Sequence, residues 1–297
     1  MLVTIATLAA GWLSDFRLLW RAIGGPAAPS PRPASSSSCA RSDNAMDCAA
    51  LVAFSKTAGP KLKWQMDGKT SMCSWDGVTC SLSGRVSALV APGLKLKGTL
   101  PSEMGQLTEM TSLRLEGNSF TGTLPSEVWR LSGLADLNLA NSHFSGTLSS
   151  QIGRLSGLEH LELGGYTWTQ TGIYSGSSDL SGTLPSEVGQ LTGLMSLKLL
   201  SYLSGTLPSE VGKLTGLTML TLSGDDFSGT LPSEVGKLTE LTSLQLRHTM
   251  LSGTLPSSLC KIESCDCAGT FMTAPPSDAD PPPTLLFPSR CCFLPHS

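Results

Sequence analysis

One tetrapeptide, Gly-Thr-Leu-Pro, recurs along the middle of the 297-residue chain and constrains its fold more than any other feature. It begins at Gly98, Gly122, Gly182, Gly205, Gly229 and Gly253, and a variant with Ser in place of Pro begins at Gly146. The successive steps are 24, 24, 36, 23, 24 and 24 residues long. A fixed period in this range is typical of a solenoid, in which each repeat forms one coil that stacks on the next.

Apolar residues keep one register inside each unit. In the unit that begins at Met110, Leu113 and Leu115 form a Leu-x-Leu pair, which alternates in and out as a short strand does, and Phe120 points inward from the rest of the coil. Each unit buries about five apolar side chains, which contribute roughly 1.5–3 kcal/mol each. Ordering one whole unit costs more, at roughly 1–2 kcal/mol per residue of backbone. A single coil is therefore unstable, and stacking stabilises the array.

The segment Pro-Ser-Glu-Val-Gly follows the tetrapeptide and is expected on the return side of each coil. Its Ser is predicted to cap a short helical turn, its Glu is favoured near the helix N-terminus, and its Gly is predicted to end the turn. The glutamates would then form a row, for which a solvated capping role is favoured over a functional acidic surface. They are Glu103, Glu127, Glu187, Glu210 and Glu234.

Composition argues against several function classes. Charged residues make up 14% of the chain, the formal net charge is −3, and no basic stripe of the kind that binds nucleic acid is present. The sequence has no His-x-x-x-His, Gly-x-Ser-x-Gly or phosphate-cradling loop, so neither an enzyme nor a cofactor is expected. The spacing in Cys265-Asp-Cys267 and Cys291-Cys292 is poor for a structural zinc site, so no metal is expected either.

Nine cysteines flank a long central stretch that has none. Cysteines at both ends of such a stretch indicate end caps held by disulfides, and hence an oxidising compartment; free thiols or a zinc site are the alternatives. Because the number is odd, at least one thiol is free or pairs between chains. The nine are Cys39, Cys48, Cys73, Cys80, Cys260, Cys265, Cys267, Cys291 and Cys292.

The repeat and the segment before it resemble the plant-type leucine-rich repeat. The unit Leu-x-x-Leu-x-Leu-x-x-Asn-x-Phe-Ser-Gly-Thr-Leu-Pro is similar to the repeat of receptor-like kinase and receptor-like protein ectodomains and of polygalacturonase-inhibiting proteins. Residues 46–91 resemble the N-terminal cap of that class, with Asp47 in its opening helix, Trp64 at its tryptophan position, and the run from Cys73 to Cys80 as its cysteine signature. The resemblance implies a disulfide between Cys73 and Cys80.

The fold implied is an α/β solenoid, a right-handed superhelix with a parallel β-sheet on the concave face and short helical turns on the convex side. In this class an Asn ladder joins the coils. Its position holds Asn118, Ser142, Asp225 and Thr249, whereas Asn141 lies one place early. The Ser, Asp and Thr side chains are expected to accept a backbone hydrogen bond in place of Asn.

The chain is expected to divide into six segments. Residues 1–25 hold an apolar run of signal-peptide length, for which organelle targeting is the alternative, and no later run is long enough for a transmembrane segment. The others are a Pro/Ser-rich linker at 26–45, the N-terminal cap at 46–91, about seven repeats at 92–259, a C-terminal cap at 260–268 and a Pro-rich disordered tail at 269–297. The expected location is secreted, cell-surface or endomembrane.

Strand residues beside the buried leucines are predicted to face the concave surface, which solenoids use for binding. These positions are polar, of mixed sign, and variable, while the convex positions are nearly invariant. The alternative is that any exposed strand face is polar. The candidate ligand-binding residues are Arg114, Glu116, Asp136, Asn138, His160, Glu162, Lys198, Thr221, Gln245 and Arg247.

The 36-residue step carries 12 extra residues within 164–179. Insertions in solenoids emerge as loops and often bind partners. This one holds Tyr166, Trp168 and Tyr174, which are either binding anchors or rings that fold back over the disturbed stacking.

These features predict a non-catalytic recognition module that binds a protein, peptide or glycan on its concave face, in a receptor-like signalling or defence role. Because no kinase signature follows the repeats, signalling would pass through a partner such as a membrane co-receptor. The alternatives are an inhibitor of an extracellular hydrolase such as a polygalacturonase, and a structural adhesion repeat.

Overall fold

The computed structural model describes residues 38–168, 174–176, 179–200, 202–223, 226–267 and 270–273, all within the unit Ser37–Ser297. The expected signal peptide, most of the expected linker and the expected tail from residue 274 lie outside these ranges. Across the ranges given, no helix has the length and apolar character that crossing a membrane requires.

The chain enters the array through helix α2 (Ala45–Ala58). Asn44 begins this helix, because its Oδ1 accepts hydrogen bonds from the backbone amides of Met46 and Asp47, both at 3.1 Å. Phe54 is fully buried, and its ring centroid lies 5.8 Å from that of Phe120 in the first coils. The helix therefore closes the apolar end of the stack.

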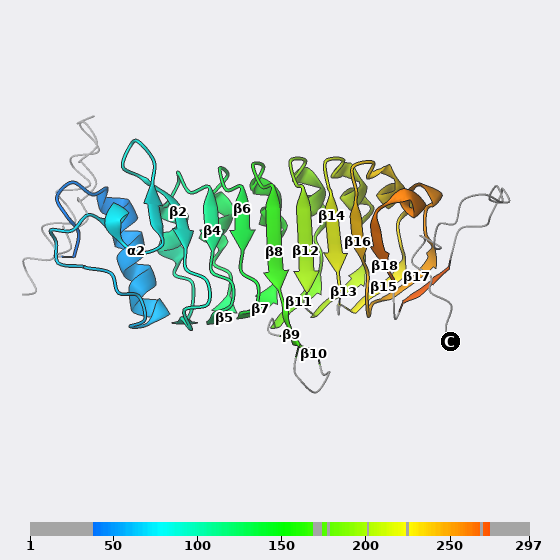
Figure 1. Ribbon diagram of the computed structural model, residues 1–297, viewed down its shortest axis with the longest axis horizontal. Helices are drawn as coiled ribbons and strands as arrows, with labels where there is room; N and C mark the ends of the chain where they lie inside the picture. Colours follow the sequence, from blue (N-terminus) through cyan, green and yellow to red (C-terminus); the bar gives the residue numbers. More distant parts are fainter. Residues whose placement is uncertain are drawn as a thin grey trace, which may run out of the picture. The chain divides into compact units, whose positions relative to one another are not determined.

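Nine strands form one sheet, in the order β1-β2-β4-β6-β8-β12-β14-β16-β18 (Figure 1). Only β1 and β2 pair antiparallel, and every later neighbour pairs parallel. The strands are β1 (Val78–Cys80), β2 (Val86–Val90), β4 (Ser112–Arg114), β6 (Asp136–Asn138), β8 (His160–Gly164), β12 (Ser196–Leu200), β14 (Met219–Leu222), β16 (Ser243–Gln245) and β18 (Ser264–Asp266).

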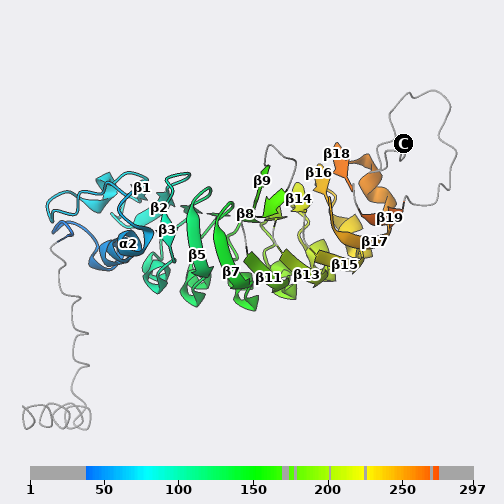
Figure 2. The ribbon, with the colours of Figure 1, turned by 90° about the horizontal axis from the view of Figure 1, so that it is seen from below.

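Eight strands form a second parallel sheet, which the sequence analysis did not anticipate because it assigned one strand to each coil. Its order is β19-β17-β15-β13-β11-β7-β5-β3, and Figure 2 shows most of these strands side by side. The strands are β3 (Lys97–Gly98), β5 (Ser119–Thr123), β7 (His143–Thr147), β11 (Asp179–Thr183), β13 (Tyr202–Thr206), β15 (Asp226–Thr230), β17 (Met250–Thr254) and β19 (Phe271–Thr273). The Phe-Ser-Gly-Thr part of the repeat builds them.

Short 3₁₀ helices complete the coils, one after each Gly-Thr-Leu-Pro or its variant, and one further 3₁₀ turn, η1 (Met72–Ser74), lies in the cap. They confirm the predicted solenoid of parallel strands and short helical turns. The seven are η2 (Ser102–Gln106), η3 (Ser126–Arg130), η4 (Ser150–Arg154), η5 (Ser186–Gln190), η6 (Ser209–Lys213), η7 (Ser233–Lys237) and η8 (Ser257–Lys261).

The core is a continuous apolar column between the sheets and the 3₁₀ helices. Leu113, Leu115, Leu137 and Leu139 are at most 1% exposed, as the Leu-x-Leu register predicts. Aligned strands carry the register from coil to coil, with Leu113 opposite Leu137 in the parallel ladder. Stacked apolar rows of this kind stabilise each coil through its neighbours.

The predicted role of the serine in Pro-Ser-Glu-Val-Gly was wrong. Pro101 is the N-cap of η2, so Ser102 lies one position inside the helix, and its Oγ donates to Glu103 Oε2 at 3.3 Å. The same Ser–Glu pair recurs in four other coils. Where Ser149 replaces the proline, it becomes the N-cap, and its Oγ accepts from the backbone amide of Gln151.

The predicted role of the glycine was wrong as well. Gly105 lies within η2 and does not end it. A Cβ atom at Gly105 would lie 2.5 Å from the backbone oxygen of Glu127, in the next coil. Gly189 and Gly212 meet the following coil in the same way. Glycine is needed here because neighbouring 3₁₀ helices approach too closely to admit a side chain.

The insertion leaves both sheets intact. Its described parts are strands β9 (Tyr166–Trp168) and β10 (Tyr174–Gly176), which pair antiparallel. On either side of it, β8 pairs with β12 and β7 pairs with β11. The side chains of Tyr166, Trp168 and Tyr174 lie outside the described residues, so their two predicted roles stay predictions.

Candidate functional site

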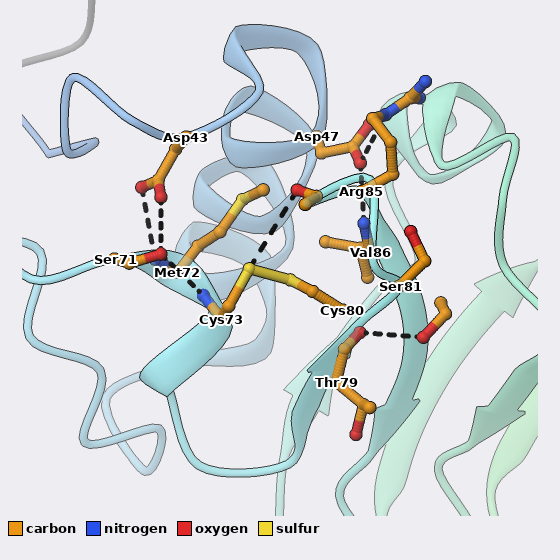
Figure 3. The surroundings of a disulfide bond; sticks show 12 residues. Asp43, Asp47, Ser71, Met72, Cys73, Thr79, Cys80, Ser81, Arg85 and Val86 are labelled. Carbon is orange, nitrogen blue, oxygen red and sulfur yellow. Dashed lines mark hydrogen bonds and ion pairs between the residues drawn. A yellow bond between two sulfur atoms is a disulfide. The ribbon is translucent and has the colours of Figure 1, made fainter.

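Disulfides hold both ends of the array. Cys39 pairs with Cys48. Cys73 pairs with Cys80, as the family resemblance implies (Figure 3). At the other end, Cys260 and Cys265 are also disulfide-bonded. Cys267 is a buried free thiol, and burial raises its pKa to about 12. Cys291 and Cys292 lie outside the described residues.

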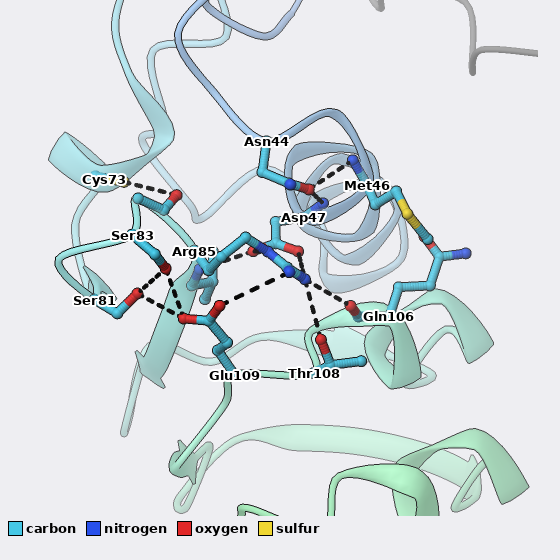
Figure 4. A network of polar contacts seen from close by, with 12 residues as sticks. Asn44, Met46, Asp47, Cys73, Ser81, Ser83, Arg85, Gln106, Thr108 and Glu109 are labelled. Carbon is cyan, nitrogen blue, oxygen red and sulfur yellow. Dashed lines mark hydrogen bonds and ion pairs between the residues drawn. The ribbon is translucent and has the colours of Figure 1, made fainter.

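Asp47 is fully buried and joins the cap helix to the first coil (Figure 4). Its Oδ1 accepts from Arg85 Nη2 at 2.8 Å, and its Oδ2 accepts from Arg85 Nε at 2.9 Å and from the Val86 amide at 2.8 Å. The hydrogen bond with Asp47 raises the pKa of Arg85. Arg85 also donates to Thr108 Oγ1 at 3.2 Å. This network fixes the start of the nine-stranded sheet.

Among the described residues, Asn118 makes the hydrogen bonds expected of the ladder. Asn118 Nδ2 donates to Leu115 O at 2.7 Å and to Ala91 O at 2.8 Å, and its Oδ1 accepts from the Leu96 amide at 3.0 Å. At Ser142 and Thr249 the replacement does not accept a backbone hydrogen bond. Thr249 donates instead, to Leu246 O at 3.1 Å, because its hydroxyl faces a carbonyl.

Ser142 and Asn141 complete that correction. Ser142 Oγ is buried without a hydrogen-bond partner among the described residues. Asn141 has φ 54°, in the left-handed region that Asn tolerates better than most residues, so it serves the turn and not the ladder. Asp225 lies outside the described residues.

Six of the predicted binding residues come together on the outer face of the nine-stranded sheet. Arg114 Nη2 donates to Glu116 Oε1 at 2.8 Å, and its Nε lies 3.8 Å from Asp136 Oδ2. Glu162 Oε2 accepts from Asn138 Nδ2 at 3.3 Å and from Lys198 Nζ at 3.5 Å. We call these residues the polar row: Arg114, Glu116, Asp136, Asn138, Glu162 and Lys198.

The polar row combines order with access. Strands β4, β6, β8 and β12 are consecutive in the sheet and hold four of its residues opposite one another: Arg114, Asn138, Glu162 and Lys198. The side chain of Arg114 is 43% exposed and that of Lys198 is 33% exposed. Glu116 raises the pKa of Arg114, with smaller contributions from Asp136 and Glu162. Three carboxylates face two cations, so the row carries a net negative charge.

Two polar atoms of the row make no hydrogen bond within the described structure. Glu116 Oε2 and Arg114 Nε are buried atoms with no hydrogen-bond partner in the described part of the chain. Unpaired buried polar atoms are costly, and a ligand would reach these two only if the side chains turned outward.

The remaining predicted residues do not join the row. His160 is exposed and Thr221 is half-buried, and neither makes a side-chain hydrogen bond to any residue that the structure describes. Gln245 Nε2 donates to Ser264 Oγ at 3.2 Å, and Arg247 forms an ion pair with Asp266.

Sequence reasoning missed Ser264 and Asp266, because it placed no strand in the C-terminal cap. Ser264 and Asp266 stand opposite Ser243 and Gln245 in the ladder between β16 and β18. The alternation Ser-Cys-Asp, in which Cys265 stands opposite Leu244, was the available signal.

Comparisons with known proteins agree with this architecture. Residues 44–81 match the family "Leucine rich repeat N-terminal domain", and residues 109–131 and 240–262 match "Leucine Rich Repeat". The Arabidopsis thaliana leucine-rich repeat receptor protein kinase EMS1 is 38% identical over 87 residues, which is 28% of this chain and 7% of that protein. The chain thus spans a small part of that relative's length.

Solved structures show the same fold. The structure of PEPR1 with AtPEP1 superimposes with a TM-score of 0.67 and 28% identity, over 76% of this chain and 32% of that one. A plant ice-binding protein superimposes with a TM-score of 0.60 over 77% of this chain and 88% of that one, and at 21% identity this likeness concerns the fold alone.

Proposed function

We propose that this chain, which carries a leucine-rich-repeat N-terminal domain followed by leucine-rich repeats, is a recognition module for an extended peptide or protein segment. The ligand binds across the outer face of the nine-stranded sheet. The polar row carries this proposal, because it is the ordered, partly exposed network on that face.

The chemistry of the row indicates the kind of segment. Asp136 and Glu162 favour a basic or amide-bearing side chain on the ligand, since carboxylates accept such donors strongly. Arg114 and Lys198 flank them and would donate hydrogen bonds to carbonyl or carboxylate oxygens of the ligand. A segment with alternating polar groups matches this order better than an apolar helix does, because the residues of the row are all polar or charged.

Two further observations support the proposal. The ectodomains to which the chain is similar include PEPR1, whose structure was solved with AtPEP1. The disulfides at both ends of the array fit an extracellular or endomembrane location, where thiols are oxidised. In this role the chain binds without catalysing a reaction, and signalling passes through a partner such as a membrane co-receptor.

Peptide selection tests the proposal. A random peptide library is displayed and selected on the purified chain, and the affinity of the selected peptides is measured by calorimetry. Glu162→Gln removes a charged acceptor, so we expect binding to weaken by about 1.5–3 kcal/mol, the usual contribution of a hydrogen bond to a charged group. Glu187→Gln makes the same chemical change on the 3₁₀ side and serves as the matched control.

The outcomes are distinguishable. Selected peptides that bind Glu162→Gln and the unmodified chain equally well would place recognition away from the polar row. Inhibition of a polygalacturonase by the chain, lost in Glu162→Gln and kept in Glu187→Gln, would favour the hydrolase-inhibitor alternative on the same face.

A further inference from the structure

On the outer face of the eight-stranded sheet, two outward positions of each strand repeat from coil to coil, whereas the first outward position varies, as in His143, Asp179 and Tyr202. Each coil contributes the Thr of Gly-Thr-Leu-Pro or its variant, and all seven threonines are exposed. We call them the threonine row: Thr99, Thr123, Thr147, Thr183, Thr206, Thr230 and Thr254. Two residues earlier on each strand except the first stands a second hydroxyl: Thr121, Ser145, Ser181, Ser204, Ser228 and Ser252.

The methyl groups of the threonine row are held in place. A Cβ atom added at Gly122 would lie 2.9 Å from Thr99 Cγ2, and one added at Gly146 would lie 2.9 Å from Thr123 Cγ2. In the next four coils, the distance from a Cβ atom added at the glycine to the Thr Cγ2 of the preceding coil is 2.9 to 3.4 Å. Each of these methyl groups therefore rests on the glycine of the following coil, and the side chains share one orientation.

The hydroxyl groups divide into two sets. Those of the threonine row donate to no residue that the structure describes, so they face solvent. Several of the second set are anchored: Ser252 Oγ donates to Gly229 O at 3.0 Å, and Ser204 Oγ donates to Gly182 O at 3.3 Å. An anchored donor leaves the oxygen lone pairs directed outward at fixed positions.

Strand pairing arranges the two sets in two dimensions. Thr123 stands opposite Ser145, and Thr147 stands opposite Ser181. Neighbouring strands lie about 4.7–4.9 Å apart, and two residues along a strand span roughly 6.6 Å. The hydroxyls thus repeat at regular spacings from coil to coil, and these spacings are close to oxygen–oxygen repeats on the surfaces of hexagonal ice.

The repetition of these two hydroxyl positions limits the kinds of partner that can bind to them. A surface that repeats from coil to coil fits a partner that repeats in the same way, which leaves crystal surfaces and linear polymers. The two hydroxyl sets contain no charge, and the exposed carboxylates of Asp179 and Asp226 stand at the strand starts, outside both sets. The exposed rings on which a sugar could stack, Tyr202 on β13 and Phe271 on β19, belong to neither set and do not repeat from coil to coil. We propose that the threonine row and its neighbouring hydroxyls bind the surface of ice.

The test measures incorporation of the full chain into a slowly growing polycrystalline ice shell. Thr183→Tyr with Thr206→Tyr places two bulky rings at the centre of the threonine row. Thr192→Tyr with Thr215→Tyr makes the same change at exposed turn positions and is the matched control. We expect the unmodified chain and the control to enter the ice, and the row variant to lose most of the ice-bound fraction. Circular dichroism melting curves verify folding.

A milder variant keeps the test decisive if the tyrosines unfold the chain. Thr183→Ser with Thr206→Ser keeps both hydroxyls, removes only the methyl groups, and should lower incorporation while leaving the fold intact. Exclusion of the unmodified chain from ice would overturn the proposal. So would incorporation unchanged in both row variants. Sedimentation with microcrystalline cellulose or chitin, without entry into ice, would assign the face to a polysaccharide instead. Glu162→Gln should leave ice incorporation unchanged, which separates this site from the peptide site.

Discussion

The first coils and the later coils have the same backbone but treat their buried polar groups differently. Near the N-terminus, the Asp47 carboxylate receives three hydrogen bonds and the Asn118 amide makes three short ones. Farther along, Thr249 makes one and Ser142 Oγ makes none within the described structure. Parallel pairing nevertheless continues through β14 and β16. Apolar stacking and strand pairing therefore suffice to propagate coils, whereas starting the array requires a bonded polar network.

Of the variants that test this contrast, removal of Asp47 should reduce the stability of the fold most. Asp47→Ala removes the buried partner of the Val86 amide and of Arg85, whose side chain is 23% exposed, so we expect a loss of about 3 kcal/mol in the free energy of unfolding, the lower end for a buried pair. Urea titration followed by circular dichroism measures it. Asp226→Ala, at an exposed position of β15, is the control. A loss below about 1 kcal/mol would show that the cap does not depend on this pair.

The ladder position offers a second test. Asn118→Ala leaves a buried amide and two carbonyls unpaired, so we expect a loss of about 2–3 kcal/mol. Thr249→Ala removes one hydrogen bond and should cost about 1 kcal/mol. Thermal unfolding of the two variants gives the difference. Equal losses would mean that the early and late coils do not differ at this position.

A smaller effect is expected at the C-terminal end. The Arg247 side chain is 50% exposed in its ion pair with Asp266, and exposed pairs contribute about 0–1 kcal/mol. Arg247→Ala should therefore cost less than about 1 kcal/mol, and the cost should vanish at about 1 M salt, where screening is short-ranged. A salt-independent loss would instead indicate that Arg247 contributes through packing.

The smallest effect should come from Ser142. Its hydroxyl is buried and unbonded, so Ser142→Ala removes a polar group without breaking a hydrogen bond. We expect a change within about 0.5 kcal/mol, or a slight gain in stability. A loss above about 1 kcal/mol would reveal a hydrogen bond that Ser142 makes in solution, and would bring the later coils closer to the first.

The sequence predicted the elements that depend on periodic burial. The Leu-x-Leu register placed Leu113 and Leu137 in the core and in a parallel sheet, and the family resemblance implied the Cys73–Cys80 disulfide. It did not show that the segment around the inward Phe of each coil is a strand, because one buried residue in a short segment fits several backbone conformations. The eight-stranded sheet was missed for that reason.

The sequence also could not predict the roles of residues that are determined by contact with a neighbouring coil. Gly105 was predicted to end a helix. Its role instead depends on Glu127, which belongs to the next coil and lies close to Gly105 in space. The polar row was predictable as a set of outward residues on adjacent strands. Its internal pairing, such as Glu162 between Asn138 and Lys198, depends on side-chain reach across strands, and periodicity carries no information about that reach.

The junction at the insertion has a practical consequence. Residues 160–164 and 179–183 keep full pairing with the coils beside them although 14 residues separate the two segments. The stack thus tolerates foreign sequence at this junction, since closing a longer loop adds only about 0.6 kcal/mol for each doubling of its length. An epitope tag or a fluorescent label grafted between 165 and 178 would report on the assembled array without entering either sheet.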